Sequence, residues 1–172
     1  LALPAQLRLK APEGYAYYAL LPEFYAALAL GLPQRQVPVL VLGIRSIGTS
    51  LGATAAAALH SIRPVVERMS VRPGGHPFDR TLQLSERQRA RILQLQAANA
   101  DFVIVDEGPG LSGSSLLSVA HALERCGVPP TRIHLFCSHR PDPQRLVAPR
   151  AAERWMRYRC YAAASFRPSA EC

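Results

Sequence analysis

The stretch Phe102-Val103-Ile104-Val105-Asp106-Glu107-Gly108-Pro109-Gly110-Leu111-Ser112-Gly113-Ser114-Ser115 carries the strongest information about the fold. Its first four residues are all apolar, as in a strand that is buried on both faces. Two carboxylates follow where that strand should end, and small residues then lead into an apolar run that predicts a helix from Gly113 to Cys126. A buried strand, a polar loop and a helix in this order are typical of α/β proteins.

The loop between the acid pair and this helix predicts an anion site. Unpaired N–H groups and the positive end of the helix dipole make a helix N-terminus a favourable place for a phosphate. Asp106 and Glu107 would repel a phosphate, so they need hydroxyl groups or a metal as partners. A ligand with a phosphate at one end and a diol beside it satisfies both halves, and ribose 5-phosphate is such a ligand.

Short apolar strands alternate with helices along the rest of the chain. The predicted strands are residues 37–42, 65–71, 102–105 and 133–137, and the predicted helices are residues 15–32, 51–60, 85–99, 113–126 and 151–164. We therefore expect an α/β fold in a single domain, with a mostly parallel twisted sheet and helices on both faces. In such a sheet the loops after Leu42, Val71 and Val105 open on one edge, where ligands bind.

Two further loops belong to that edge. The segment from Gly43 to Ser50 follows the first buried strand and is polar, and we expect it to be a loop. The segment from Arg72 to Arg80 is interrupted by glycine and proline, which predicts a mobile loop.

The acid pair and the serine-rich loop resemble the signature that type I phosphoribosyltransferases use to bind 5-phosphoribosyl-1-pyrophosphate (PRPP). In that signature a hydrophobic run precedes two acids and a Thr/Ser-Gly-x-Thr/Ser phosphate loop. The resemblance implies that Asp106 and Glu107 hold the ribose 2- and 3-hydroxyls. The residues implied for the 5-phosphate are Gly110, Leu111, Ser112, Gly113, Ser114 and Ser115. The resemblance also implies a PRPP-binding core at residues 37–140, an N-terminal helical segment at 1–36 and a C-terminal helical tail at 141–172.

The other two loops are similar to the family's pyrophosphate loop and its flexible catalytic loop. The residues implied for pyrophosphate are Arg45, Ser46, Ile47 and Gly48. The residues implied for the flexible loop are Arg72, His76 and Arg80, and Arg80 would be catalytic together with the acid pair. The resemblance further implies a Mg²⁺ ion that is held through the ligand, a nitrogenous small-molecule acceptor and a homodimer. A cytoplasmic location is expected from the cysteine pattern, which favours reduced thiols.

The chain departs from the family's pattern at three points. The second acid is Glu107 where the family usually has Asp, the spacer Gly108-Pro109-Gly110 is one residue longer, and the segment 72–80 has no lysine. The resemblance is greatest to a bacterial subgroup of predicted phosphoribosyltransferases that is associated with tellurium-resistance gene clusters.

The length and composition of the chain limit the number of domains and the classes of partner. The 172 residues are enough for one compact core, and no apolar run approaches the length of a membrane span. Since the first residue is Leu1 and not Met, we expect a chain that has been trimmed or cut from a longer protein. The four cysteines form no CxxC pair, so reduced thiols are expected. Arginine supplies nearly all of the charge of +8, and this composition reflects either genomic base composition or an anionic partner, such as a phosphorylated metabolite or nucleic acid.

Several alternatives remain open at this stage. Gly108, Gly110 and Gly113 also match the glycine spacing of a dinucleotide fingerprint, although an acid pair beside a pyrophosphate argues against it. Arg140 stands where such a site usually has an acid, which leaves open a variant that binds the 2-phosphate of NADP. Another alternative is a non-catalytic module that senses PRPP or a nucleotide and binds nucleic acid. Structural roles are also open for the acid pair, for Arg45 and for His76, and we expect His60, His121 and His134 to be structural. The tyrosines at positions 15, 17, 18 and 25 are expected in the core rather than around a base.

Overall fold

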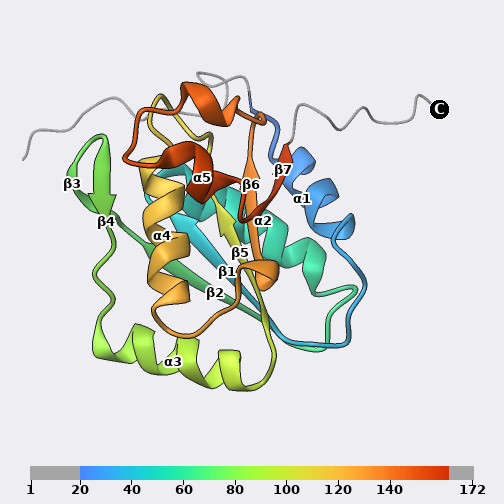
Figure 1. Ribbon diagram of the computed structural model, residues 1–172. Helices are drawn as coiled ribbons and strands as arrows, with labels where there is room; N and C mark the ends of the chain where they lie inside the picture. Colours follow the sequence, from blue (N-terminus) through green and yellow to red (C-terminus); the bar gives the residue numbers. More distant parts are fainter. Residues whose placement is uncertain (1–19, 163–172) are drawn as a thin grey trace, which may run out of the picture.

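The computed structural model describes residues 20–162, which form one five-stranded parallel sheet with helices on both faces (Figure 1). The strands of this sheet are β1 (Val39–Ile44), β2 (Val66–Val71), β5 (Asp101–Val105), β6 (Ile133–Cys137) and β7 (Arg159–Ala162), in the order β2-β1-β5-β6-β7. The helices are α1 (Pro22–Leu30), α2 (Ile47–Leu59), α3 (Glu86–Ala97), α4 (Ser114–Glu124) and α5 (Ala151–Trp155). Short 3₁₀ turns lie at Pro130–Arg132 and Pro143–Arg145. This confirms the predicted α/β fold with a parallel sheet.

The central strands bury both of their faces, as their unbroken apolar runs predict. Val103 and Val105 face a core with α1 and α2, whereas Phe102 and Ile104 face a core with α3, α4 and α5. In Figure 1, α4 lies in front of the sheet and α2 behind it. The alternation of side chains along each strand therefore divides the core into two layers.

The strand order reverses between β1 and β5, which are neighbours at the centre of the sheet. The connection after β1 runs through α2 on one face, and the connection after β5 runs through α4 on the other. Crevices at such a reversal lie outside the carboxyl ends of the strands and are the usual ligand sites of open α/β sheets. The acid pair at the end of β5 stands at this point.

The first predicted loop is shorter than expected. β1 continues to Ile44 and α2 already begins at Ile47, so only two residues of the predicted loop 43–50 are neither strand nor helix. The physical reason is a close contact between backbones. A Cβ atom on Gly43 would lie 2.5 Å from the carbonyl oxygen of Gly48, and one on Gly48 would lie 2.4 Å from that of Val105. Glycine at both positions lets the first turn of α2 pack directly against the ends of β1 and β5.

The segment expected to be a mobile loop is a two-stranded antiparallel hairpin. Its strands are β3 (Gly74–His76) and β4 (Asp79–Thr81), and Gly75 takes a positive φ of 90°. The prediction of a loop was wrong because the glycines that suggested a break instead permit the hairpin backbone. The tip of the hairpin, at Pro77, lies beside the start of α4 (Figure 1).

The C-terminal tail is also different from the expected helix over residues 151–164. Helix α5 ends at Trp155, and the chain then forms the edge strand β7, which pairs in parallel with β6. Trp155 and Tyr158 are buried against the α4 side of the sheet. The hydrogen bonds to β6 come from a distant part of the chain, so local periodicity does not reveal them.

The N-terminal helix is confirmed from Pro22 to Leu30, and Tyr25 is completely buried in the core as expected. Tyr15, Tyr17 and Tyr18 lie outside the described residues. The helix predicted near Ser85 begins with the expected capping box between Ser85 and Gln88. Within residues 20–162, no helix combines the length and the apolar character needed to cross a bilayer.

Gly113 is predicted to be essential for folding rather than for phosphate contact. Its φ is +69°, and an added Cβ would lie 3.1 Å from Cδ1 of Leu146 and 3.5 Å from Trp155. Gly113→Val should therefore lower the free energy of unfolding by about 2–4 kcal/mol, through left-handed strain and overpacking. Gly110 is the matched control, since its φ is +58° but an added Cβ meets nothing within 4 Å. Gly110→Ala should cost about 1 kcal/mol. Urea unfolding followed by circular dichroism measures both, and equal losses would contradict the packing argument.

Candidate functional site

A cleft of about 460 Å³ opens at the carboxyl edge of the sheet, a volume in the range of small-molecule sites. It lies between the tip of the β3–β4 hairpin, the end of β5, the loop before α4 and the end of β6. Its lining residues are Leu20, Pro77, Phe78, Arg80, Asp106, Glu107, Gly108, Pro109, Gly110, Leu111, Ser112, Ser115, Ser138 and His139. The structure thus brings the predicted acid pair, part of the predicted phosphate loop and Arg80 to one cleft.

Asp106 of the acid pair has a partly buried carboxyl group with a raised pKa. Burial raises the pKa of Asp106 to about 7, and the charge of Glu107 adds to this effect. The backbone N–H of Glu107, which donates to Oδ1 of Asp106 at 3.0 Å, and the Arg80 guanidinium both oppose the rise in this pKa. Asp106 therefore has a strong need for a hydroxyl or cationic partner when it is ionised.

Tyr25 on α1 fixes the backbone of the acid pair. Its hydroxyl donates to the carbonyl oxygen of Asp106 at 2.9 Å, and the carbonyl oxygen of Glu107 lies 3.3 Å away. Burial raises the pKa of the Tyr25 hydroxyl, so it stays protonated and keeps its role as a donor. A side chain far away in the sequence thus holds the end of β5 in place.

The loop before α4 presents backbone N–H groups to the cleft. The N–H of Gly113 donates to the carbonyl oxygen of Pro109 at 2.8 Å and closes a turn. Among residues 20–162, the N–H groups of Leu111, Ser112 and Ser115 have no hydrogen-bond acceptor. With α4 beginning at Ser114, these donors lie at the positive end of an eleven-residue helix. The loop therefore has the chemistry of an anion site.

Two of the predicted phosphate-binding serines make internal contacts instead. The hydroxyl of Ser114 donates to the carbonyl oxygen of Pro77 at 2.7 Å, and Oγ of Ser112 lies 2.9 Å from Oγ of Ser114. Both side chains are buried, and they tie the hairpin tip to the start of α4. Ser114 and Gly113 do not line the cleft, so Ser115 is the serine at this helix start with a hydroxyl left for a ligand.

The predicted pyrophosphate residues lie next to the cleft rather than in its lining. Arg45 and Ser46 are exposed after β1, the peptide between them is cis, and the N–H of Arg45 donates to the carbonyl oxygen of Val71 at 2.9 Å. Ile47 and Gly48 are buried, and Gly48 lies against the backbone of Asp106. The segment is therefore adjacent to the acid pair through the backbone, while the Arg45 side chain is exposed.

The hairpin contributes one of its three predicted residues. Arg80 lines the cleft and donates to the carbonyl oxygen of Pro73 at 3.4 Å. Arg72 and His76 are exposed and lie outside the cleft lining, and Nδ1 of His76 accepts from the N–H of Phe78 at 3.3 Å. His76 is thus an exposed residue at the end of strand β3 and not a loop residue.

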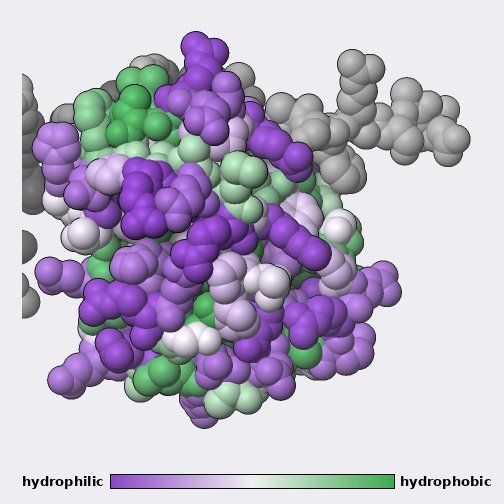
Figure 2. Space-filling model, viewed as in Figure 1, coloured by the Kyte–Doolittle hydropathy of each residue, from purple (hydrophilic) through white to green (hydrophobic). Residues whose placement is uncertain are grey.

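Sequence reasoning missed Phe78, Ser138 and His139 among the residues that line the cleft. His139 lies at the end of β6, and its Nδ1 is 3.0 Å from Oγ of Ser138. Phe78 is a large apolar residue that is 46% exposed, and it lines the cleft together with the predicted residue Leu111, which is 78% exposed. Figure 2 shows hydrophobic surface near the hairpin, on a face that is otherwise mostly hydrophilic. The position of Ser138 and His139 directly after a buried strand is the signal that identifies these two.

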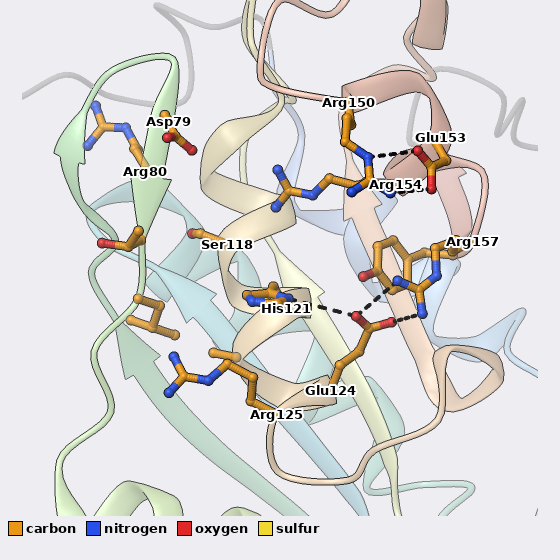
Figure 3. A pocket seen from close by; sticks show the side chains of 14 residues that line it. Asp79, Arg80, Ser118, His121, Glu124, Arg125, Arg150, Glu153, Arg154 and Arg157 are labelled. Atoms are coloured by element: carbon orange, nitrogen blue, oxygen red, sulfur yellow. Dashed lines mark hydrogen bonds and ion pairs between the residues drawn. The ribbon is translucent and has the colours of Figure 1, made fainter.

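A second hollow, of about 430 Å³, lies between β4, α4 and α5 and is rich in arginine (Figure 3). Most of its cations are already paired. Arg150 bridges Glu153 at 2.7 Å and Arg157 bridges Glu124 at 2.7 Å, and Arg154 donates to backbone oxygens. The hollow lies on the α4 face rather than at the carboxyl ends of the strands, so it is not the candidate active site.

The described residues show no group of three or more His, Cys, Asp or Glu side chains arranged to hold a metal ion. Cys126, Cys137 and Cys160 are free thiols in this structure.

The comparisons with known proteins leave the family open. No family model matches the sequence, and no curated protein matches it. Among solved structures, 2,5-dihydroxypyridine dioxygenase from Pseudomonas putida KT2440 shares 15% identity, with a TM-score of 0.35. The match covers 76% of this chain and 36% of the dioxygenase chain, so this chain spans about a third of the length of that protein. A likeness this weak carries no argument about function.

Ser112→Ala and Ser114→Ala together should release the hairpin tip from α4. The loss of the two hydrogen bonds to the carbonyl oxygen of Pro77 should lower the free energy of unfolding by about 1–3 kcal/mol. Amide exchange in β3 and β4 should accelerate much more than in β1. Ser115→Ala is the control, because its side chain makes no such contact and should leave exchange unchanged. Unchanged hairpin exchange in the double variant would contradict this account.

The raised pKa of Asp106 predicts a pH-dependent stability. Because the folded pKa of about 7 exceeds the ordinary value of 3.8, the folded chain binds this proton more tightly than the unfolded chain does. The contribution of Asp106 to stability is therefore present below about pH 4 and is lost as the pH rises to about 7. Between pH 5 and 8 the wild type should lose about 1–2 kcal/mol relative to Asp106→Asn, whose side chain does not titrate. Parallel pH dependences for both proteins in urea unfolding would show that Asp106 titrates normally.

Proposed function

We propose that this chain binds PRPP and transfers its ribose 5-phosphate group to a nitrogenous small-molecule acceptor, with release of pyrophosphate. The observation that carries the proposal is that Asp106 and Glu107 line the same cleft as the loop before α4, whose backbone N–H groups at Leu111 and Ser112 have no acceptor among residues 20–162. Hydroxyl groups satisfy the first half and a phosphate satisfies the second. A ribose 5-phosphate unit joins both groups at a short distance.

In this proposal the loop from Gly110 to Ser115 binds the 5-phosphate mainly through backbone N–H groups. The hydroxyl of Ser115 adds one donor, while Ser112 and Ser114 act by fixing the hairpin tip against the loop. Leu111 and Phe78 give the cleft an apolar rim that limits access of water. The ribose then lies over the acid pair.

The diphosphate would lie toward the reversal between β1 and β5. Gly48 in the first turn of α2 packs against Asp106, so backbone donors after β1 are within a short reach of the ribose site. Arg45 is exposed and has the planar donor geometry that suits a diphosphate. Arg80 of the hairpin lines the same cleft as the acid pair.

The donor set fits a Mg²⁺ ion that is held largely by the ligand. Asp106 and Glu107 supply the carboxylate oxygens that Mg²⁺ accepts, and Mg²⁺ usually keeps waters and phosphate oxygens as its other ligands. When bound, Mg²⁺ would neutralise charge on the diphosphate leaving group.

In this reaction the protein mainly has to hold PRPP and the acceptor in the correct orientation. No side chain has to form a covalent bond with either. The acceptor nitrogen forms a bond to the ribose C1 while the bond from C1 to the diphosphate oxygen breaks, and the electron pair leaves with pyrophosphate. Positive charge that develops on the ribose ring is stabilised by the carboxylates of Asp106 and Glu107. Holding the two reactants in line supplies most of the rate enhancement.

PRPP with Mg²⁺ should raise the midpoint of thermal unfolding in a concentration-dependent way, and NADP should not. Asp106→Asn combined with Glu107→Gln keeps the size of both side chains but removes their charge. This double variant should fold and should bind PRPP at least tenfold more weakly in calorimetry, the equivalent of about 1.4 kcal/mol. Stabilisation by NADP but not by PRPP would instead support the dinucleotide interpretation of Gly108, Gly110 and Gly113.

A further inference from the structure

A separate hollow of about 380 Å³ lies at the opposite edge of the sheet, where β5, β6 and β7 begin. Three guanidinium groups line it, from Arg35 after α1, Arg132 before β6 and Arg159 at the start of β7. Its one carboxylate is Asp101 at the start of β5. The lining is therefore strongly cationic. It shares no residue with the lining of the candidate active site.

The carboxylate of Asp101 is already neutralised by other contacts. Asp101 is 1% exposed, its Oδ1 accepts from Arg35, and its Oδ2 lies 3.3 Å from Nη2 of Arg63. Arg63 is itself buried and donates to the carbonyl oxygen of Pro33 at 2.7 Å. Asp101 thus compensates Arg63 and part of the charge of Arg35.

The remaining cations lack comparable partners. Arg132 donates to Oδ1 of Asn99 at 3.3 Å, which is a neutral and long contact. The guanidinium of Arg159 has no hydrogen-bond acceptor among residues 20–162. The hollow therefore concentrates positive charge that the protein does not neutralise.

His134 also lines this hollow, and the Nδ1 atom of its ring lacks a hydrogen bond. Its side chain is on β6 beside Arg159 on β7, with which it is in register, and the residue is only 3% exposed. Its Nδ1 is buried without a partner, which is rare for a polar ring atom in a protein interior. Burial lowers the pKa of His134 to about 4, and the charges of Arg159, Arg63 and Arg35 lower it further.

We infer that this hollow is a second anion site that binds a phosphate group, as inorganic phosphate or a phosphate monoester, through Arg35, Arg132, Arg159 and a ring N–H of His134. Three guanidinium groups from separate segments suit the charge and the tetrahedral oxygens of a phosphate dianion. The anion would give the buried imidazole the hydrogen bond that it lacks. It would also neutralise cations that otherwise repel one another.

The second anion site does not depend on the proposed transferase activity. Asp101 and Asp106 lie at opposite ends of β5, so a ligand at this edge does not contact the acid pair. Because β5 and β6 run between the two edges, an anion here would stabilise the strands that end at the catalytic cleft. Its binding is measurable without PRPP.

The test is a titration of the full chain with inorganic phosphate at constant ionic strength, maintained with chloride, and followed by the ring NMR signals of His134. These signals should shift and saturate, and the pKa of His134 should rise because a bound anion offsets the charges of Arg35, Arg63, Arg132 and Arg159 that surround it. Asp101 and Tyr161 also face this region. Ribose 5-phosphate in place of inorganic phosphate distinguishes a monoester from the free ion.

Arg159→Gln should weaken phosphate binding at the His134 signals about tenfold, as expected for one lost charge-assisted hydrogen bond. Arg125→Gln is the matched control, since it removes the same charge from an exposed arginine in the hollow of Figure 3, and it should bind as the wild type does. Unshifted His134 signals, or equal affinities in the two variants, would overturn the inference. If phosphate moves only the amide signals of Gly110 and Leu111, the candidate active site stands and this second site does not.

Discussion

The contact between the first turn of α2 and the end of β5 determines the geometry of this protein. It is possible only because Gly43 and Gly48 have no side chains, since a Cβ on Gly48 would lie 2.4 Å from the carbonyl oxygen of Val105. The contact brings the segment after β1 beside the acid pair after β5. Helices α2 and α4 then leave to opposite faces of the sheet, and the crevice between their starting points is the candidate site.

Tyr25 and the two buried serines complete this arrangement from outside the strands. Tyr25 reaches the backbone of the acid pair from α1, and Ser112 and Ser114 hold the hairpin tip against the start of α4. The polar groups that would face a ligand are thus fixed by residues that would not contact it. Such support allows backbone N–H groups and carboxylates to stay in place without a ligand.

Much of this fold could be predicted from the sequence, because the buried strands are continuous apolar runs with clear boundaries. The strand Ile133–Cys137 and the capped helix after Ser85 have local signals and were predicted within a residue or two. The edge strand β7 and the β3–β4 hairpin were not, because their pairing depends on partners distant in the sequence or on glycine geometry. For the same reason, the sequence indicated the acid pair and the phosphate loop but could not reveal that Ser112 and Ser114 face the hairpin.

The two edges of the sheet differ in their electrostatics. At the carboxyl edge, a carboxyl with a raised pKa lies beside unpaired N–H groups, which suits a ligand with both hydroxyls and phosphate. At the amino edge, arginines surround a buried imidazole with a lowered pKa, which suits an anion alone. The same strands connect both edges, so the two proposed ligand sites lie about one strand length apart.

The central claim is that the acid pair binds the hydroxyls of a ribose whose phosphate lies on the loop before α4. Calorimetry with ribose 5-phosphate and 2-deoxyribose 5-phosphate tests it most directly, because the two ligands differ in one hydroxyl and share the phosphate. The wild type should prefer ribose 5-phosphate about tenfold, and the variant with both Asp106→Asn and Glu107→Gln should show a much smaller preference. Equal affinities for the two sugars in the wild type would contradict the assignment of Asp106 and Glu107 to the ribose.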